Sequence, residues 1–256
     1  MVIAEVFPNP TVKQVIFQIR FPNLFYMEGK IGDLQLKIMK EFPKSSLLLR
    51  RQVVFVDAGP NVRIEDVSPK SDEEFGRKVW QFESDKKYRL SVLTNSLDIV
   101  SEFHKTYNGN DPNKFRDIIE FVLKSFFEAT LIPFINRIGL RYIDECPITS
   151  KDNETFKAWY NSVFPIDRFS IIDADEMQFR TVTKRGDFHL MYAETLQKIK
   201  DDYKLILDFD ASAIDIPPEK CMEITDKLHE TISDEYEKTI KKPVYEYMRK
   251  KVTETA

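Results

Sequence analysis

Apolar and polar residues alternate through residues 133–148, and the predicted fold is organised around this stretch. Three apolar side chains would share one face of a strand here: Ile138, Leu140 and Tyr142. Arg137 and Arg141 would share the other face, with Gly139 between them. Because glycine has no side chain, we expect a backbone or another strand to approach closely at this point. The pattern predicts a strand with one apolar and one cationic face.

The same period of two recurs along the chain and predicts strands at residues 12–21, 47–56, 78–83, 88–94, 97–103, 179–183, 188–192 and 202–209. Apolar residues at helical spacing predict helices at residues 31–42, 113–129 and 154–162, a long helix from Pro217 to about residue 240, and a short helix after Pro243. Residues 60–76 are polar and acidic, which indicates a loop.

Short turns join successive strands, and helices are inserted singly between them. This order is typical of an α+β fold with a mainly antiparallel sheet. We expect an N-terminal α+β part at 1–110 and a second α+β part with the C-terminal helices at 111–256, or one continuous unit.

Composition narrows the class of protein. The chain has 256 residues, a net charge of −4, 20 phenylalanines and 10 tyrosines. Two cysteines are too few for a disulfide framework and suggest a reducing, cytoplasmic setting. We expect no membrane insertion, because no apolar run approaches the roughly 20 residues that span a bilayer. The N-terminus lacks a basic region followed by an apolar segment, so secretion is not indicated. The acidic balance argues against an indiscriminate nucleic-acid binder, although it leaves room for a local basic face.

The residues give little sign of catalysis. None of the three histidines, His104, His189 and His229, stands at metal-ligand spacing from another ligand residue, so we expect no zinc and no cofactor. Asp208 and Asp210 would point to one face of a strand and could share a divalent cation, as in a metal-dependent enzyme or toxin. The simpler interpretation is that these aspartates face solvent while the alternating apolar residues face the core. We therefore expect no catalytic residues.

Cations are spread over several predicted strands and turns. Their simplest interpretation is solvated turns and helix ends, and the functional one is a face that follows a phosphate backbone. The candidate nucleic-acid-binding residues are Arg20, Arg50, Arg51, Lys86, Lys87, Arg89, Arg137, Arg141, Lys184 and Arg185. Arg20, Arg137 and Arg141 are the better candidates, because a cation is less expected within a strand than in a turn. Alternatively, these arginines pair with local carboxylates such as Asp144 and Glu145 and serve folding only.

Five blocks of sequence together resemble a sporadically distributed prokaryotic family of mostly uncharacterised proteins, and they span nearly the whole chain. The blocks lie at residues 12–22, 31–43, 135–144 (INRIGLRYID), 205–211 and 228–240. The family pattern often has asparagine after RYI, where this sequence has Asp144.

Some proteins of this kind resemble the missing amino-terminal half of split Argonautes, in which a short Argonaute chain carries only the MID and PIWI domains. The resemblance implies a fold like the Argonaute N-terminal and linker domains. It implies a non-catalytic partner that forms a heterodimer with the short Argonaute and helps bind guide and target nucleic acid in prokaryotic defence. A homodimer is expected if that partner is absent, and a self-associating interaction protein without nucleic acid is a further alternative.

Overall fold

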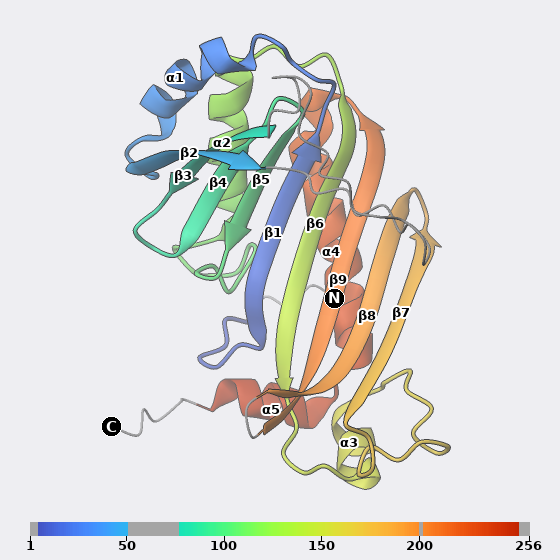
Figure 1. The fold of residues 1–256 in the computed structure, drawn as a ribbon. Helices are drawn as coiled ribbons and strands as arrows, with labels where there is room; N and C mark the ends of the chain where they lie inside the picture. Colours follow the sequence, from blue (N-terminus) through green and yellow to red (C-terminus); the bar gives the residue numbers. More distant parts are fainter. Residues whose placement is uncertain (1–4, 51–76, 200–201, 251–256) are drawn as a thin grey trace, which may run out of the picture.

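The computed structural model describes residues 5–50, 77–199 and 202–250 (Figure 1). Its centre is a nine-stranded sheet with the order β2-β3-β4-β5-β1-β6-β9-β8-β7. Every pair of neighbouring strands is antiparallel. The strands are β1 (Val12–Arg20), β2 (Lys44–Arg50), β3 (Arg77–Glu83), β4 (Tyr88–Val92), β5 (Ser96–Ser101), β6 (Ile135–Pro147), β7 (Glu176–Arg185), β8 (Phe188–Ile199) and β9 (Asp202–Ile216).

Helices cover one face of this sheet. The helices are α1 (Met27–Ile38), α2 (Phe115–Ala129), α3 (Asn153–Trp159), α4 (Cys221–Thr239) and α5 (Lys242–Arg249), with a 3-10 turn, η1 (Pro218–Lys220), before α4. In Figure 1, α1 and α2 lie behind the half of the sheet that contains β3, β4 and β5, and α4 lies behind β6, β9 and β8. The short helices α3 and α5 lie together at one end of the long strands. The part of the chain that the structure describes places no helix on the opposite face, which we call the open face.

Alternation along each strand explains why this arrangement forms. Ile138 and Leu140 of β6 are fully buried toward the helices, as are Leu207 and Phe209 of β9. The residues between them, Gly139 and Asp208, turn to the open face. Burying one face and hydrating the other is the usual solution for an antiparallel sheet. The prediction of an α+β fold with a mainly antiparallel sheet is confirmed.

Most predicted elements are present, with shifted ends. The helix predicted at 31–42 begins earlier, at Met27, which is fully buried. The last strand continues to Ile216 instead of ending near residue 209. The long helix ends at Thr239, before Pro243, and the short helix predicted after Pro243 begins at Lys242, so that the proline lies in its first turn. Residues 51–56 of one predicted strand and the loop predicted at 60–76 lie outside the described residues.

β1 joins the two predicted parts of the chain. It pairs with β5 on one side and with β6 on the other, so residues from 1–110 and from 111–256 share one continuous sheet. Among the described residues, no helix combines the length and the apolar character needed to cross a membrane.

Candidate functional site

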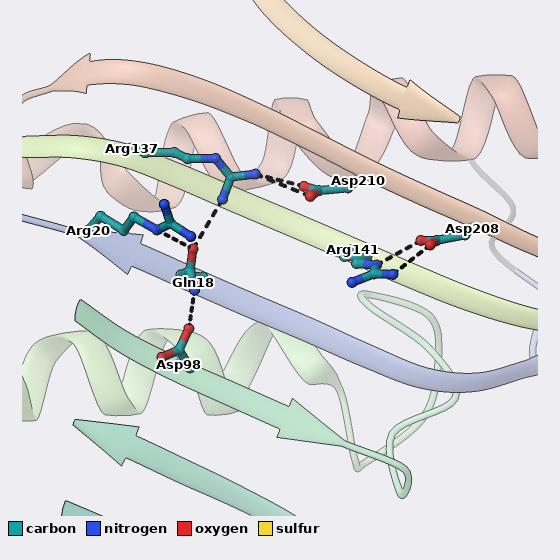
Figure 2. A network of polar contacts seen from close by, with 7 residues as sticks. All are labelled: Gln18, Arg20, Asp98, Arg137, Arg141, Asp208 and Asp210. Carbon is teal, nitrogen blue, oxygen red and sulfur yellow. Dashed lines mark hydrogen bonds and ion pairs between the residues drawn. The ribbon is translucent and has the colours of Figure 1, made fainter. Parts of the chain in front are cut away.

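The open face carries a row of hydrogen-bonded polar side chains where β5, β1, β6 and β9 lie next to each other (Figure 2). The register between β1 and β6 determines which of these side chains are neighbours. Gln18 of β1 lies opposite Gly139 of β6, and Arg20 lies opposite Arg137. Cross-strand partners point to the same face of a sheet, so the arginines predicted to share a face do so.

Arg137 is fixed by two neighbouring strands. Its Nη2 donates to both carboxylate oxygens of Asp210, at 2.9 and 3.2 Å, and its Nη1 donates to Oε1 of Gln18 at 3.3 Å. The side chain crosses Gly139 on the way, because a Cβ atom placed on Gly139 would lie 2.5 Å from Nη1. The missing side chain of Gly139 therefore leaves room for a guanidinium group. The expectation that it admits a backbone or another strand is wrong.

Gln18 links Arg20 to the same network. Its Oε1 also accepts from Nε of Arg20 at 2.8 Å, and its Nε2 donates to Oδ1 of Asp98 on β5. The contacts therefore run without a break from β5 to β9 (Figure 2). Sequence reasoning missed Gln18 and Asp98 as site residues, and the available signal was that Gln18 lies two residues before Arg20 and so on the same face of the strand.

Arg141 forms a separate bidentate pair. Its Nε and Nη2 donate to the two carboxylate oxygens of Asp208, at 2.7 and 2.6 Å. The hydrogen bonds to Asp208 raise the pKa of the Arg141 guanidinium. The side chain is 39% exposed, and its Nη1 donates to no described residue. Arg141 is therefore held by a bidentate pair while part of its side chain remains exposed.

The carboxylates that pair with these arginines are not those named from the sequence. Asp144 lies on the helix-covered face and is buried, and Glu145 lies 3.7 Å from Nζ of Lys204. Asp208 and Asp210 do share the open face, but each accepts hydrogen bonds from its own arginine. Within the described ranges, no three His, Cys, Asp or Glu side chains are grouped so that they could hold a metal ion.

The remaining candidate cations are dispersed. Arg89 is exposed on β4 and lies in one cross-strand row with Val100, Ile16 and Arg141, so it shares the open face. Lys86 and Lys87 form the turn between β3 and β4, and Lys184 and Arg185 end β7 at the turn into β8. Six strand steps separate β4 from β7, about 29 Å across the sheet.

Two of these cations have local partners. Lys86 lies over the ring of Phe103, with its Nζ 5.6 Å from the ring centroid, and Arg185 donates to Glu235 at 3.2 Å. Arg50 is the last residue of β2, but its side chain and the whole of Arg51 lie outside the described residues. The structure thus brings together Arg20, Arg137 and Arg141, with Arg89 nearby on the same face, and leaves the turn cations apart.

Comparison of the chain with protein-family models, with curated proteins and with solved structures found no match.

Proposed function

We propose that this protein is a non-catalytic subunit that binds the sugar-phosphate backbone of nucleic acid through its open face and joins a short Argonaute chain. The observation that supports this most is the placement of Arg20, Arg137 and Arg141 on neighbouring strands of the open face. Backbone binding needs hydrogen-bond donors spread over a surface rather than a catalytic cluster. Sequence would then be read by pairing between guide and target strands.

The ion pairs define how such a face would work. A guanidinium group has five N–H donors, and Arg141 uses only Nε and Nη2 for Asp208. Nη1 remains for a phosphate oxygen, and the carboxylate fixes the plane in which it points. The carboxylates orient the guanidinium groups, and each contact with a phosphate would still be a charge-assisted hydrogen bond whose formation releases counterions.

The partnership with a second chain has a separate support. Phe25 and Leu131 are 90% and 83% exposed, the highest values among the exposed large apolar residues of the described chain. Their segments lie side by side, because the hydroxyl of Tyr26 donates to the carbonyl oxygen of Leu131 at 2.5 Å. Adjacent exposed apolar side chains of this size often mark a protein–protein contact. We assign this patch, Phe25 with Leu131, to the contact with the Argonaute chain.

The alternative of a metal-dependent enzyme or toxin uses Asp208 and Asp210. Both carboxylates accept hydrogen bonds from arginines, so a shared cation would first have to displace two guanidinium groups. For this reason we favour the non-catalytic subunit.

A salt series on the protein co-expressed with its short Argonaute tests the proposal. Replacing Arg137 and Arg141 together with alanine should weaken duplex binding equally for every sequence. It should also make the dependence of log K on log salt shallower, by up to about 0.9 per lost phosphate contact. Unchanged affinity with a lowered melting temperature would instead assign these arginines to folding only.

A further inference from the structure

One edge of β1 loses its neighbouring strand before β1 itself ends. The pairing of β1 with β5 begins at Val15, so β5 has no residue beside residues 12–14. The chain that follows β5 instead brings the ammonium group of Lys105 to this edge. Its Nζ donates to the carbonyl oxygen of Val12 at 3.0 Å and to that of Lys13 at 3.5 Å. Two backbone carbonyls therefore hold one cation beside the sheet.

A hollow of about 450 Å³ lies at this edge, and two more lysines line it. Lys13 has no partner on β6, because the register shifts between Val12 and Gln14. Lys87 has a positive φ of 59° in the turn between β3 and β4, and its carbonyl oxygen accepts from the backbone N–H of Glu102 at 3.2 Å. Two local irregularities of the backbone thus bring these lysines to the hollow that Lys105 also lines.

Positive charge is in excess in this hollow. Two carboxylates also line it, those of Glu102 and Glu145, but Glu145 pairs with a lysine outside it at 3.7 Å. Three ammonium groups therefore face one carboxylate that is left to them. Within the part of the chain that the structure describes, none of the three lysines forms an ion pair of its own.

The three cations lie close enough to act on each other. Desolvation by the surrounding chain lowers the pKa of the Lys105 ammonium group. The charges of Lys13 and Lys87 lower this pKa further, although nearby carboxylates act in the opposite direction. An anion in the hollow would relieve this repulsion between like charges.

The hollow lies beside the row of arginines. Gln14 and Ile143 line it and are cross-strand partners in β1 and β6. Ile143 follows Arg141 by two residues, so it shares the open face with Arg141 and lies about 7 Å further along β6. The hollow therefore continues the cationic row that begins at Arg20 and Arg137.

We propose that this hollow binds a phosphate group, which Lys13, Lys87 and Lys105 contact together; we call these three residues the lysine site. An ammonium group is a compact charge with three rotatable donors, so each lysine can approach a phosphate oxygen from its own direction. The phosphate has two possible sources. A nucleic-acid strand that crosses Arg141 would supply a backbone phosphate, and this source rests on the proposed function. A free phosphate ion would not need the arginines.

Acetylation of lysines in the full chain, measured residue by residue by mass spectrometry, tests this assignment. The two probes are inorganic phosphate and a short nucleic-acid duplex, each compared with chloride at equal ionic strength. A probe at about twice its Kd should slow labelling of the lysine site about threefold, because labelling follows the unoccupied fraction. Lys40, an exposed residue just after α1, should be labelled at an unchanged rate.

A pair of variants tests whether the three lysines act together. Lys13→Gln with Lys87→Gln removes two charges and leaves Lys105 with its backbone partners. Protection of Lys105 should then need about tenfold more of the same probe, at about threefold for each exposed charge. The matched control is Lys40→Gln with Lys124→Gln, which removes as much charge from exposed positions on the helix side and should change nothing. Circular dichroism checks that both variants fold.

The two probes distinguish the sources. Protection by inorganic phosphate would show that the lysine site takes a free ion, and protection by the duplex only would show that it takes a backbone phosphate. Protection by neither probe, or equal protection of Lys40, would overturn the assignment. Duplex binding that depends on Arg141 but leaves the lysine site unprotected would overturn this inference and leave the proposed function standing. Protection by inorganic phosphate without duplex binding would do the reverse.

Discussion

Asp144→Asn should change how stability depends on pH, because burial raises the pKa of this carboxyl from 3.8 to about 7. The hydrogen bond from Thr11 and the charge of Lys105 act in the opposite direction but do not offset burial. A raised pKa means that the folded state favours the protonated carboxyl. Its stabilising effect is therefore complete below about pH 4 and is lost as pH rises to about 7. At about 1.36 kcal/mol for each pH unit between these values, the loss is roughly 4 kcal/mol.

Two buried histidines change stability with pH in the opposite direction. The pH dependence of wild-type stability alone therefore does not isolate the contribution of Asp144. Burial lowers the pKa of both His104 and His229 from 6.5 to about 4. Their neutral forms stabilise the fold above about pH 6.5, and this contribution, about 3 kcal/mol each, is lost as pH falls to about 4. The difference between wild type and the asparagine variant cancels these terms, because both proteins keep the histidines.

Urea unfolding of both proteins at a series of pH values measures this difference. Asparagine resembles the protonated carboxyl and can keep the hydrogen bond from Thr11. We expect similar stabilities near pH 4 and a variant that is more stable than wild type by up to about 4 kcal/mol near pH 8. A difference that stays constant with pH would refute the buried, reluctantly ionised state assigned to Asp144.

Three further outcomes follow from the structure. Gly139→Ala should destabilise the fold by about 1–2 kcal/mol in urea unfolding, since the added Cβ displaces the guanidinium group of Arg137. Gly32→Ala, in an exposed helical position with open space around it, should instead stabilise the fold by about 0.5–1 kcal/mol. Equal effects of the two substitutions would contradict the packing described at Gly139. Both thiols should resist alkylation in the native protein near pH 8 and react in urea, because burial raises the pKa of Cys146 well above 9 and that of Cys221 to about 12; rapid native labelling would show that they are accessible. Phe25→Asp should leave the melting temperature almost unchanged yet abolish co-purification with the Argonaute chain, and retained co-purification would move the contact elsewhere.

Strand alternation was readable from the sequence because the sheet buries one face and hydrates the other. This contrast placed β1 and β6 correctly and put Arg137 and Arg141 on one face. The contrast weakens at the end of β9, where small residues such as Ala211 and Ala213 fill the buried positions, so the strand was predicted too short. The start of helix α1 was predicted too late for a similar reason, since Met27 is the one buried residue in its first turn.

The contacts of the site depend on register, which the sequence does not display. Asp208 and Asp210 reach the arginines because β9 pairs with β6 in one alignment, while Glu145, close in sequence, lies further along the strand. The role of Gly139 depends equally on the conformation of one flexible side chain, that of Arg137, which the sequence does not show.

Removing one ion pair as a unit tests most directly whether Arg141 binds nucleic acid or serves folding alone. Arg141→Ala with Asp208→Ala removes a bidentate pair without changing the net charge of the open face. The matched control is Arg116→Ala with Asp226→Ala, which removes a bidentate pair between α2 and α4 on the helix side.

The measurement is the affinity of the assembled Argonaute complex for a guide–target duplex, with each complex checked for intact folding. Loss of the Arg141 pair should weaken binding by about tenfold for every duplex sequence, as expected for one lost charge-assisted hydrogen bond, while loss of the Arg116 pair should leave affinity unchanged. Equal affinities for wild type and both paired variants would contradict a nucleic-acid-binding role for Arg141.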